Sequence, residues 1–587
     1  MGVPGFFAWI LRNFKNKILL KRLQRNPKYL YIDANCLFHP ECFKILEYCQ
    51  TEIDLDKLEN KMFNRIINYL TYIEGVVGPT EMMFIAVDGT APLAKIGQQR
   101  KRRFKSIDDT KLRNDIKLKH DKHINNLWNN TVITPGTEFM EKLHSRLCEH
   151  YSNKRAKGKT NINYIYSSYH TPGEGEHKIL QHIKNDTDKS DEIVIYGLDA
   201  DLIFLALASR RTNIFLLREE IHFGAKSKSD CDNESTDPVK DVAQDLVFVS
   251  INETRNAYNE ELWRAMSNHK LVTMNVPVTT DFSNDLIFIC FLLGNDFLPH
   301  FPSIDIHRGG LDDIVSCYVN CVAETNALLI NFNKNDEVKI NNVFLLLLIQ
   351  KLGYAEAKQF QYELPKHLDI VSKRRCFAQD KYLKDIWGLE NLKNVDIYDP
   401  VGLGIGNEED WKFRYYEHYF YTSEHQEEFV DRLCFTYLEG VAWVTQYYFN
   451  KCTDWQWQFP YDNAPFISDI GTYLRKFKFD INDIKFQKKE SIPMMAQLMS
   501  VLPPACHNLL PKSYQFLVIN NESPIIDMFP IKVQLDMLYK DQHWQCIPKI
   551  PYLNIERVLR VVKENKLTTS EKTRSKILDN FKFINNK

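Results

Sequence analysis

The stretches TPGEGEHKIL (171–180) and IVIYGLDADLIFLAL (193–207) decide the fold, because each places a close pair of carboxylates beside an apolar element. The first pair flanks one glycine before an apolar helix pattern, and the second flanks one alanine between a strand-like run and another apolar helix. A strand that ends in Asp and leads into a helix is typical of the carboxyl edge of an open α/β sheet, where ligands bind. The sequence therefore predicts an α/β fold with a parallel sheet and an acidic carboxyl edge. The four acids are Glu174, Glu176, Asp199 and Asp201.

Three further acids occupy equivalent places. The apolar runs YLYI and MFIAV end at Asp33 and Asp88, and the run LIFICFLL is soon followed by Asp296. Any one acid taken alone could simply cap a helix and complement its dipole. Seven together would repel one another unless divalent cations neutralise them. Oxygen ligands without a convergent His/Cys set suit Mg²⁺ or Mn²⁺ rather than zinc, and their number indicates two ions, as in phosphodiester hydrolysis.

Length and composition narrow the class of protein. A chain of 587 residues is long for one core, so two or more domains are expected. The 44% hydrophobic and 12% aromatic content excludes wholesale disorder. Thirteen cysteines without a CxxC pair predict reduced thiols in a cytoplasmic, or alternatively nuclear, protein. Because the first ten residues lack a signal-peptide pattern and the apolar runs are too short for a bilayer, we expect a soluble, non-secreted protein without a membrane partner.

A basic segment follows the Asp88 strand. Residues 95–105 contain six Lys or Arg and no acid. Such a segment could be a solvated helix face or a localisation signal. The segment follows Asp88 after one short turn, so its Lys and Arg side chains can reach the acidic edge. This position favours phosphate binding instead. His39 lies just beyond the Asp33 edge, and from its position alone it could equally be a partly buried residue without a functional role.

Composition shifts divide the chain. Residues 1–320 hold the acids and form the predicted nuclease-like core, and the polar, acidic insert at about 225–240 is predicted to be a disordered loop. Residues 321–405 are predicted to be a helical linker. Residues 406–587 are rich in Trp and Tyr, most of which we expect in the core, although a few that face a basic channel could stack on bases.

Long motifs in order resemble a known family. They are GVPGFF, YIDANCLFH, FIAVDGTAPLAKIGQQRKRRF, HTPGEGEHKI, YGLDADLIFLAL and FLLGNDFLPHFP, followed by YLEGVAWVTQYY, WQWQFPYDNAPFISD and WQCIPKIPYL. Together they resemble both homologous regions of the XRN family of 5′→3′ exoribonucleases. The resemblance implies a PIN-related, flap-endonuclease-like α/β core, with a mostly helical, aromatic-rich C-terminal region (406–587, the second XRN homology region) capping the active site.

The resemblance also assigns roles to residues. It implies that the seven acids are metal ligands and catalytic, and that the 5′-monophosphate of the substrate occupies a pocket formed by Lys95, Gln99, Arg102 and Arg103. His39 would stack on the first base, and either Trp455 or Trp457 would cover the same nucleotide, with Trp455 favoured. Two departures are visible. The chain lacks the long C-terminal extension of the large cytoplasmic members, and Gly97 stands where the family usually has Asn.

The leading hypothesis is a Mg²⁺-dependent, processive 5′→3′ exoribonuclease that degrades single-stranded, 5′-monophosphorylated RNA to mononucleotides, with two ions that Mn²⁺ could replace. One alternative is a flap-type 5′ nuclease acting on DNA, although the aromatic C-terminal half argues against the open arch that such an enzyme needs. Another is an inactive RNA-binding scaffold, which would be expected to lack at least one of the seven acids. The sequence names no protein partner.

Deletion of residues 225–240 is expected to leave RNA cleavage nearly unchanged, because a polar segment without apolar anchors contributes little folding free energy. Cleavage rates and the thermal unfolding midpoint of the deletion variant would test this expectation. A large fall in the midpoint would show that the segment is structural.

Overall fold

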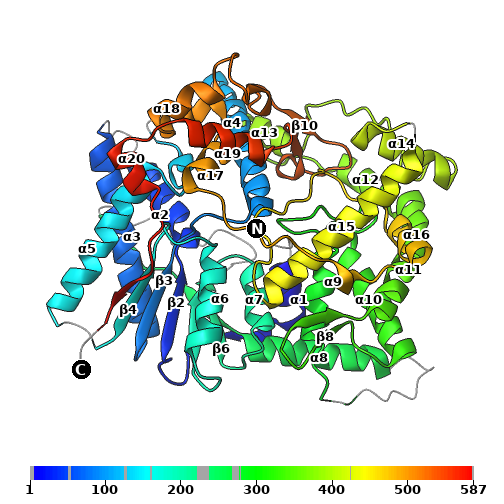
Figure 1. The fold of residues 1–587 in the computed structure, drawn as a ribbon, viewed down its shortest axis with the longest axis horizontal. Helices are drawn as coiled ribbons and strands as arrows, with labels where there is room; N and C mark the ends of the chain where they lie inside the picture. Colours follow the sequence, from blue (N-terminus) through cyan, green and yellow to red (C-terminus); the bar gives the residue numbers. More distant parts are fainter. Residues whose placement is uncertain are drawn as a thin grey trace.

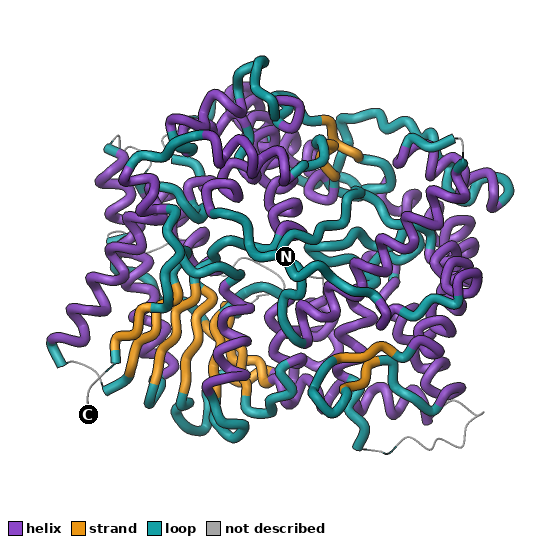
Figure 2. The backbone as a smooth tube through the Cα atoms, viewed as in Figure 1, coloured by secondary structure: helices purple, strands orange, loops and turns teal. Residues whose placement is uncertain are grey.

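The computed structural model describes residues 6–49, 54–124, 128–158, 161–220, 237–267, 277, 279–423 and 425–584. A twisted sheet fills one side of the molecule, a group of long helices fills the other, and further helices lie across the top of both (Figure 1). Figure 2 shows that the strands gather almost entirely in this one sheet. None of the helices in these ranges is long and apolar enough to cross a membrane.

In the described residues the sheet has eight strands in the order β1-β7-β6-β5-β2-β3-β4-β12. The five central strands, from β6 to β4, are parallel, whereas β1, β7 and β12 are added antiparallel at the two edges. The predicted α/β fold with a parallel sheet is therefore confirmed. The strands are β1 (Leu19–Leu20), β2 (Tyr29–Asp33), β3 (Met82–Ala86), β4 (Asn163–Ser167), β5 (Ile193–Tyr196), β6 (Ile214–Glu219), β7 (Leu246–Ser250) and β12 (Phe581–Phe583).

Helices cover both faces of the sheet and continue into the second half of the chain. Two short hairpins accompany them, β8 (Ile330–Phe332) with β9 (Val338–Ile340), and β10 (Gln534–Asp536) with β11 (Ile547–Lys549). The helices are α1 (Phe6–Ile18), α2 (Asn35–Tyr48), α3 (Leu55–Val77), α4 (Leu93–Lys119), α5 (Glu138–Ala156), α6 (Gly175–Asp186), α7 (Asp201–Ala208), α8 (Ile251–Ser267), α9 (Ser283–Phe291), α10 (Gly310–Thr325), α11 (Asn342–Lys358), α12 (Leu364–Ser372), α13 (Lys381–Glu390), α14 (Glu408–Phe420), α15 (Gln426–Phe449), α16 (Ile467–Phe477), α17 (Met494–Val501), α18 (Lys512–Gln515), α19 (Ile555–Glu564) and α20 (Thr569–Arg574).

The alternation of side chains along the central strands creates two cores. In β2, Tyr31 packs on one face, and Leu30 and Ile32 pack on the other. Helices α2, α3 and α5 cover the second face, whereas α6, α7 and α9 cover the first and connect it to α10, α11, α15 and α16. Because successive strand residues point to opposite faces, strands buried on both sides read as unbroken apolar runs. This explains the runs YLYI and MFIAV.

The C-terminal quarter packs on α4. Leu93, Ile96 and Phe104 of that helix lie in one apolar cluster with residues of α17 and α19. The basic segment and the charged segment after it therefore form a single helix, held along one side by residues some 400 positions later in the chain. The division of the chain at 320 and 405 stays a prediction, since the first core runs continuously from Phe7 to Ile481.

The predicted insert lies mostly outside the described residues. Residues 225–236 are not described, but residues 237–240 form a turn against α3, where Arg65 donates to the carbonyl of Pro238 and Asn68 donates to that of Val239. The end of the segment is therefore ordered. A deletion that spares 237–240 keeps these hydrogen bonds.

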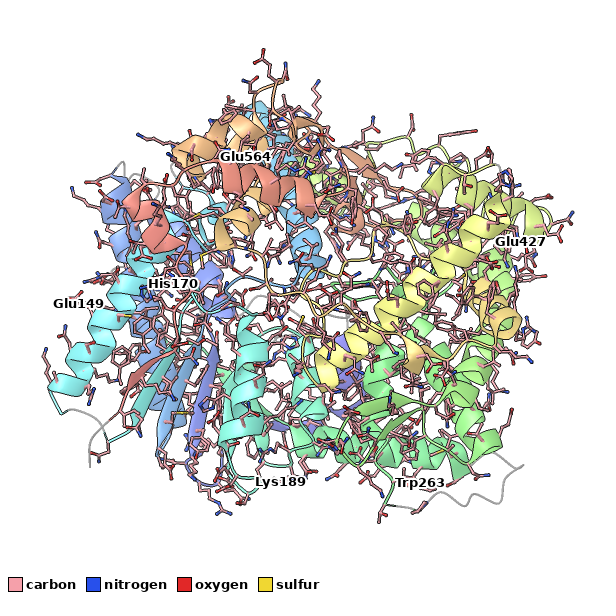
Figure 3. All side chains as sticks on the ribbon, viewed as in Figure 1. Glu149, His170, Lys189, Trp263, Glu427 and Glu564 are labelled. Carbon is pink, nitrogen blue, oxygen red and sulfur yellow. The ribbon has the colours of Figure 1, made fainter. Side chains whose placement is uncertain are left out.

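The end of the chain is fixed to the edge of the sheet beside β4. Phe581 pairs with Tyr166 in β12 and β4, and the backbone carbonyl of Lys576 lies 2.7 Å from Nδ1 of His170. Nε2 of His170 lies 3.2 Å from a carboxylate oxygen of Glu141 in α5. Figure 3 shows His170 between α5 and the segment that carries β12. The last described elements are thus part of the nuclease core.

Asp285 is expected to be a structural carboxylate. It is 1% exposed and accepts hydrogen bonds from the Tyr318 hydroxyl (2.7 Å) and from the backbone N–H groups of Leu329 and Ile330 (2.8 and 2.7 Å). Asp285→Ala would leave three buried donors unpaired and should lower the free energy of unfolding by about 3 kcal/mol or more. Tyr318→Phe removes one of the three bonds and should cost about 1 kcal/mol. Chemical denaturation measures both, and equal effects would contradict this account.

Candidate active site

All seven predicted acids lie near the carboxyl ends of the strands or in the loops that face them. Asp33 is the last residue of β2, and Asp88 follows β3 by two residues. Glu174 precedes α6 and Glu176 lies in its first turn, Asp199 and Asp201 stand at the start of α7, and Asp296 follows α9. The charges of neighbouring acids act on four of them: Asp88 on Asp33, Glu174 on Asp88, Asp201 on Glu176, and Asp296 and Asp199 on Asp201. The structure therefore brings these acids together.

Short local contacts orient the acids. The backbone N–H of Gly175 donates to Oδ1 of Asp88 at 2.7 Å, and the Cys36 thiol donates to Oδ2 of Asp33 at 3.0 Å. A Cβ at Gly175 would lie 2.8 Å from Oδ1 of Asp33 and 3.2 Å from the carbonyl oxygen of Ala86. A side chain at this position would therefore push α6 away from the strand ends. This is why a glycine separates the two glutamates.

Lys95 forms ion pairs with two of the acids. Its Nζ lies 2.6 Å from Oε1 of Glu174 and 2.7 Å from Oδ2 of Asp296. Burial alone would lower the pKa of Lys95, but the charges of Asp296 and Glu174 raise that pKa well above its ordinary value. Burial alone would likewise raise the pKa values of these two acids, but the Lys95 ammonium holds both below their ordinary values. Lys95 is therefore the resident counter-charge of the acidic edge.

For three of the remaining acids, burial and neighbouring carboxylates outweigh the charge of Lys95. Burial and the charge of Asp88 raise the pKa of Asp33 to about 8, and burial and the charge of Asp296 raise the pKa of Asp201 to about 7. Burial and the charge of Asp201 raise the pKa of Glu176 well above its usual range. Within the described part of the chain, Oε2 of Glu176 and Oδ1 of Asp201 are buried and have no hydrogen-bond donor. These shifts identify a site that would gain from additional cations.

The acids are not already closed into a cage. Among the described residues, no group of three or more His, Cys, Asp or Glu side chains has the geometry of a finished metal site. Lys95 Nζ lies between Glu174 and Asp296, so its ion pairs hold these two carboxylates in an arrangement without an added ion. The chemistry of the donors, all carboxylate oxygens with two of them unpartnered, still fits hard divalent cations.

The four residues predicted to bind phosphate separate into different environments. Lys95 points into the acidic edge, as described above. Gln99 is buried, Arg102 is exposed, and Arg103 donates to the backbone carbonyls of Thr131 and Ile133 at 3.4 Å. Burial and the charge of Arg102 lower the pKa of Arg103 to about 9. Arg102 and Arg103 thus remain together on the side of α4 that continues from the acidic edge.

His39 lies close to these two arginines. Burial, together with the charges of Arg102 and Arg103, lowers its pKa to about 4, so its ring is neutral at pH 7. A neutral ring next to two cations can stack on a base without adding a charge of its own. The structure therefore brings His39 and the arginines together from α2 and α4.

The two tryptophans differ in their surroundings. Trp457 is 8% exposed, stacks on Trp443 at a centroid distance of 5.2 Å and donates to Glu439 at 2.9 Å. Trp455 is half-buried, and its backbone carbonyl accepts a hydrogen bond from the N–H of Leu93 at the start of α4. Its ring lies 3.9 Å from the position that a Cβ at Gly173 would occupy, next to the loop that carries Glu174. Trp457 is thus a core residue, and Trp455 stands beside the site.

Two contacts at the site were not foreseen from the sequence. The Tyr447 hydroxyl in α15 donates to Oε2 of Glu174 at 2.6 Å. Lys178 Nζ donates to the carbonyls of Val87 (2.7 Å) and Ser168 (3.0 Å), which ties together the loops after β3 and β4. The only signal for Tyr447 was its place in an aromatic helix, which is more often a sign of core packing. Lys178 follows the two glutamates directly, but nothing in the sequence distinguished it from a solvated lysine.

The parallel sheet with acids gathered at its carboxyl edge defines a PIN-related α/β nuclease fold. A family model described as the XRN 5′-3′ exonuclease N-terminus matches residues 1–220, and one described as the Xrn1 helical domain matches residues 280–386 and 388–587. The chain belongs to the XRN family. The resemblance seen in its motifs is confirmed over most of its length.

Relatives agree with the family models. The 5′-3′ exoribonuclease 2 homolog of Drosophila melanogaster is 28% identical over 708 aligned residues, which cover 100% of this chain and 74% of the relative. The 5′-3′ exoribonuclease 2 of Arabidopsis thaliana is also 28% identical, and the alignment covers 100% of this chain and 69% of the relative. The human 5′-3′ exoribonuclease 1 is 28% identical over 96% of this chain, which spans about a third of that relative's length. The chain is accordingly an enzyme of the 5′-3′ exoribonuclease class, a phosphodiester hydrolase.

The two tryptophans offer a matched pair of variants. Trp457→Ala should lower the free energy of unfolding by about 3–5 kcal/mol, because it empties a stacked core position. Trp455→Ala should cost less than half as much stability but should slow RNA degradation more strongly than its effect on folding explains. Denaturation and cleavage assays at a temperature where both variants stay folded would separate these outcomes. Loss of stability without loss of rate in Trp455→Ala would contradict a role in binding the substrate.

Proposed function

We propose that this enzyme is a Mg²⁺-dependent, processive exoribonuclease that acts on single-stranded RNA with a 5′-monophosphate and releases mononucleotides. One observation carries the proposal. A single helix, α4, leads from Lys95, in contact with Glu174 and Asp296, to Arg102 and Arg103 beside His39. A phosphate bound by the arginines would lie about two helical turns along α4 from Lys95 and the carboxylates that it contacts. That spacing suits cleavage close to the 5′ end.

The acidic edge fits two divalent cations. The seven acids would hold them, with the unpartnered oxygens of Glu176 and Asp201 as ready donors. When bound, Mg²⁺, or Mn²⁺ in its place, makes water more acidic and stabilises charge on the leaving oxygen. The tyrosine hydroxyl on Glu174 and the thiol on Asp33 would keep these carboxylates oriented.

The chain's own residues would bind and orient the RNA. Arg102, Arg103 and Gln99 would bind the terminal phosphate, with the guanidinium groups able to donate two hydrogen bonds each. His39 and Trp455 would hold the first base between them by stacking, which depends little on base identity. The substrate would thus be recognised by its end and not by its sequence.

In the reaction, a water oxygen forms a bond to the phosphorus between the first and second nucleotides, and the bond from that phosphorus to the 3′ oxygen breaks. The water gives up a proton, and the leaving 3′ oxygen takes one up. The products are a nucleoside 5′-monophosphate and an RNA shortened by one nucleotide that again begins with a 5′-monophosphate. Because each cycle leaves a new 5′-monophosphate on the shortened RNA, the same phosphate pocket can bind that end in the next cycle.

The test is a time course on one RNA sequence with a 5′-monophosphate, 5′-hydroxyl, 5′-triphosphate or cap, with Mg²⁺ and with EDTA, and on DNA of the same sequence. We expect degradation of the monophosphate RNA in Mg²⁺ alone, no cleavage by Asp199→Ala or Asp201→Ala, and retained RNA binding by both variants. Turnover by either variant would overturn the metal assignment. Preference for DNA flaps would favour the flap-nuclease alternative.

Arg102→Ala tests the phosphate pocket. A lost charge-assisted hydrogen bond of ~1.5–3 kcal/mol should slow degradation of monophosphate RNA about 10- to 100-fold and change the rate on 5′-hydroxyl RNA little. Arg113→Ala is the matched control, because Arg113 lies on the same helix but pairs with Glu390 at the surface. Equal losses on both RNAs would mean that Arg102 serves general backbone binding, and the pocket assignment would fall.

A further inference from the structure

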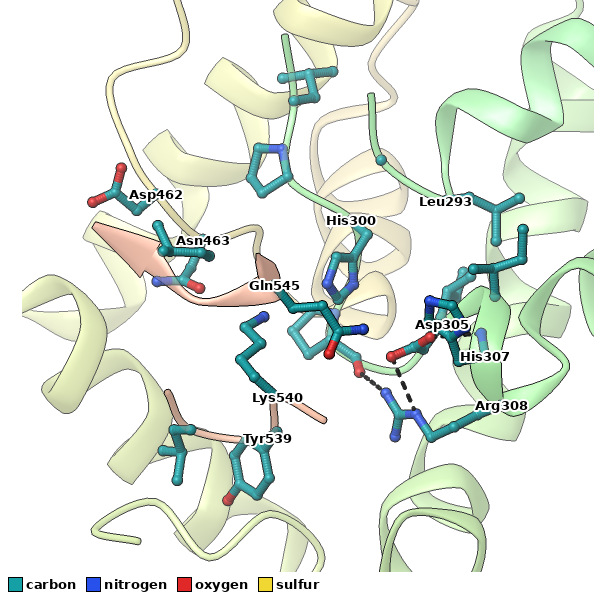
Figure 4. A pocket seen from close by; sticks show the side chains of 18 of the residues that line it. Leu293, His300, Asp305, His307, Arg308, Asp462, Asn463, Tyr539, Lys540 and Gln545 are labelled. Atoms are coloured by element: carbon teal, nitrogen blue, oxygen red, sulfur yellow. Dashed lines mark hydrogen bonds and ion pairs between the residues drawn. The ribbon is translucent and has the colours of Figure 1, made fainter. Parts of the chain in front are cut away.

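Asp296 lines a cavity of about 340 Å³, and none of the other six acids lines it. Residues after α9, α14 and the β10–β11 hairpin form its walls, and the side chains of His300, Asn463, Lys540 and Gln545 border it (Figure 4). Leu364, Leu403 and Leu538 supply apolar lining, together with the rings of Tyr415 and Tyr419. Its size and mixed lining suit a small amphipathic molecule rather than a polymer.

Asp296 separates this cavity from the acidic edge. Its Oδ2 faces Lys95 at 2.7 Å, whereas its Oδ1 accepts from Gln98 at 3.4 Å, and both Gln98 and Asp296 line the cavity. Gln98 and Lys95 are one turn apart on α4. Asp296 therefore borders both the proposed catalytic site and the cavity. The weak hydrogen bond from Gln98 to Asp296 lies between the two.

The cavity continues toward the surface. A second cavity of about 430 Å³ shares four lining residues with the first: Tyr419, Asp462, Asn463 and Ile547. The second cavity is also lined by Tyr421, which is 85% exposed. Asn463 stands where the two meet, and the described residues include no hydrogen-bond partner for its side chain. Neither Arg102 nor Arg103 lines either cavity.

Lys540 is the lysine that lines the first cavity, and Lys549 lines the second. Arg308 is paired with Asp305 at 3.6 Å, and Lys101 of α4 is paired with Asp462 at 2.5 Å. Lys540 forms no ion pair with another described residue, and its positive charge contributes to lowering the pKa of His300. The first cavity thus combines apolar and aromatic walls with the ammonium group of Lys540, and the second adds that of Lys549, a lining that matches a base and a phosphate.

We propose that the two cavities are the binding and exit route for the released nucleoside 5′-monophosphate, so that product leaves behind Asp296 while the RNA stays on the arginine side of α4. Lys540 binds the phosphate, and the walls around Tyr415 and Tyr419 hold the base. The route rests on the proposed function. It lets product depart without release of the RNA, which a processive enzyme needs.

Direct binding is the first test, and it does not require activity. Adenosine 5′-monophosphate, adenosine and inorganic phosphate are titrated by calorimetry into the wild-type protein and into Lys540→Ala. We expect the nucleotide to bind more tightly than either fragment, and Lys540→Ala to weaken nucleotide binding about tenfold through loss of a charge-assisted contact. Lys532→Ala, an exposed lysine outside both cavities, is the control and should bind as the wild type does.

Arg102→Ala separates this site from the proposed 5′-phosphate pocket. Nucleotide binding that is lost in Arg102→Ala and kept in Lys540→Ala would place the nucleotide at the arginines and overturn the cavity as its site. Nucleotide binding that falls in Lys540→Ala and persists in Arg102→Ala supports the proposal.

Kinetics test the route itself. Asn463→Trp should block the junction, so steady-state turnover should fall about fivefold or more while the rate of the first cut stays within about twofold, because product release would become limiting. Lys532→Trp places the same side chain at an exposed position outside both cavities and should turn over as the wild type does. An unchanged ratio of first-cut to steady-state rate in Asn463→Trp would overturn the exit route. Failure of the wild type to cut RNA would instead overturn the proposed function, and the titrations would still decide whether the cavity binds the nucleotide.

Discussion

The ion pairs of Lys95 are the interaction on which the arrangement of the site depends. One ammonium group joins α4 to the loop before α6 and to the loop after α9, three segments that come from residues 95, 174 and 296. Buried charges of like sign would otherwise push these segments apart, and loss of one partner from a buried ion pair typically costs ~3–5 kcal/mol. Lys95 therefore fixes two of the seven acids, Glu174 and Asp296, relative to α4.

Helix α4, which carries this lysine in its first turn, performs two tasks on different faces. Arg100 is 1% exposed and donates to the backbone carbonyls of Ser500 and Met528, so it fixes the C-terminal quarter of the chain to α4. Arg102, two residues on, is exposed on the side of His39. Because both side chains lie on α4, a movement of the C-terminal quarter would also move Arg102. The helix thus connects the packing of that quarter rigidly to the proposed phosphate contact.

The sequence was sufficient for the sheet and for the positions of the acids, because both follow from local patterns. An apolar run that ends in Asp before a helix leaves few other places for the carboxylate of Asp33 or Asp88 than the carboxyl edge. The sequence could not divide the basic segment into structural and exposed residues, since Arg100 and Arg102 differ only in partners hundreds of residues away. Nor could it choose between Trp455 and Trp457 from the residues alone, or foresee Tyr447 on Glu174, because contacts between remote segments leave no periodic signal.

The pairing of β12 with β4 has a consequence for biosynthesis. Phe581 pairs with Tyr166, so more than 400 residues must be added after β4 before its free edge is covered. At ~5–20 residues per second, that edge remains open for roughly 20–80 s on the ribosome. Open strand edges are templates for pairing with other chains. We expect the nascent chain to depend on chaperone protection during this interval, and its nuclease core to become complete only after Phe583 has been translated.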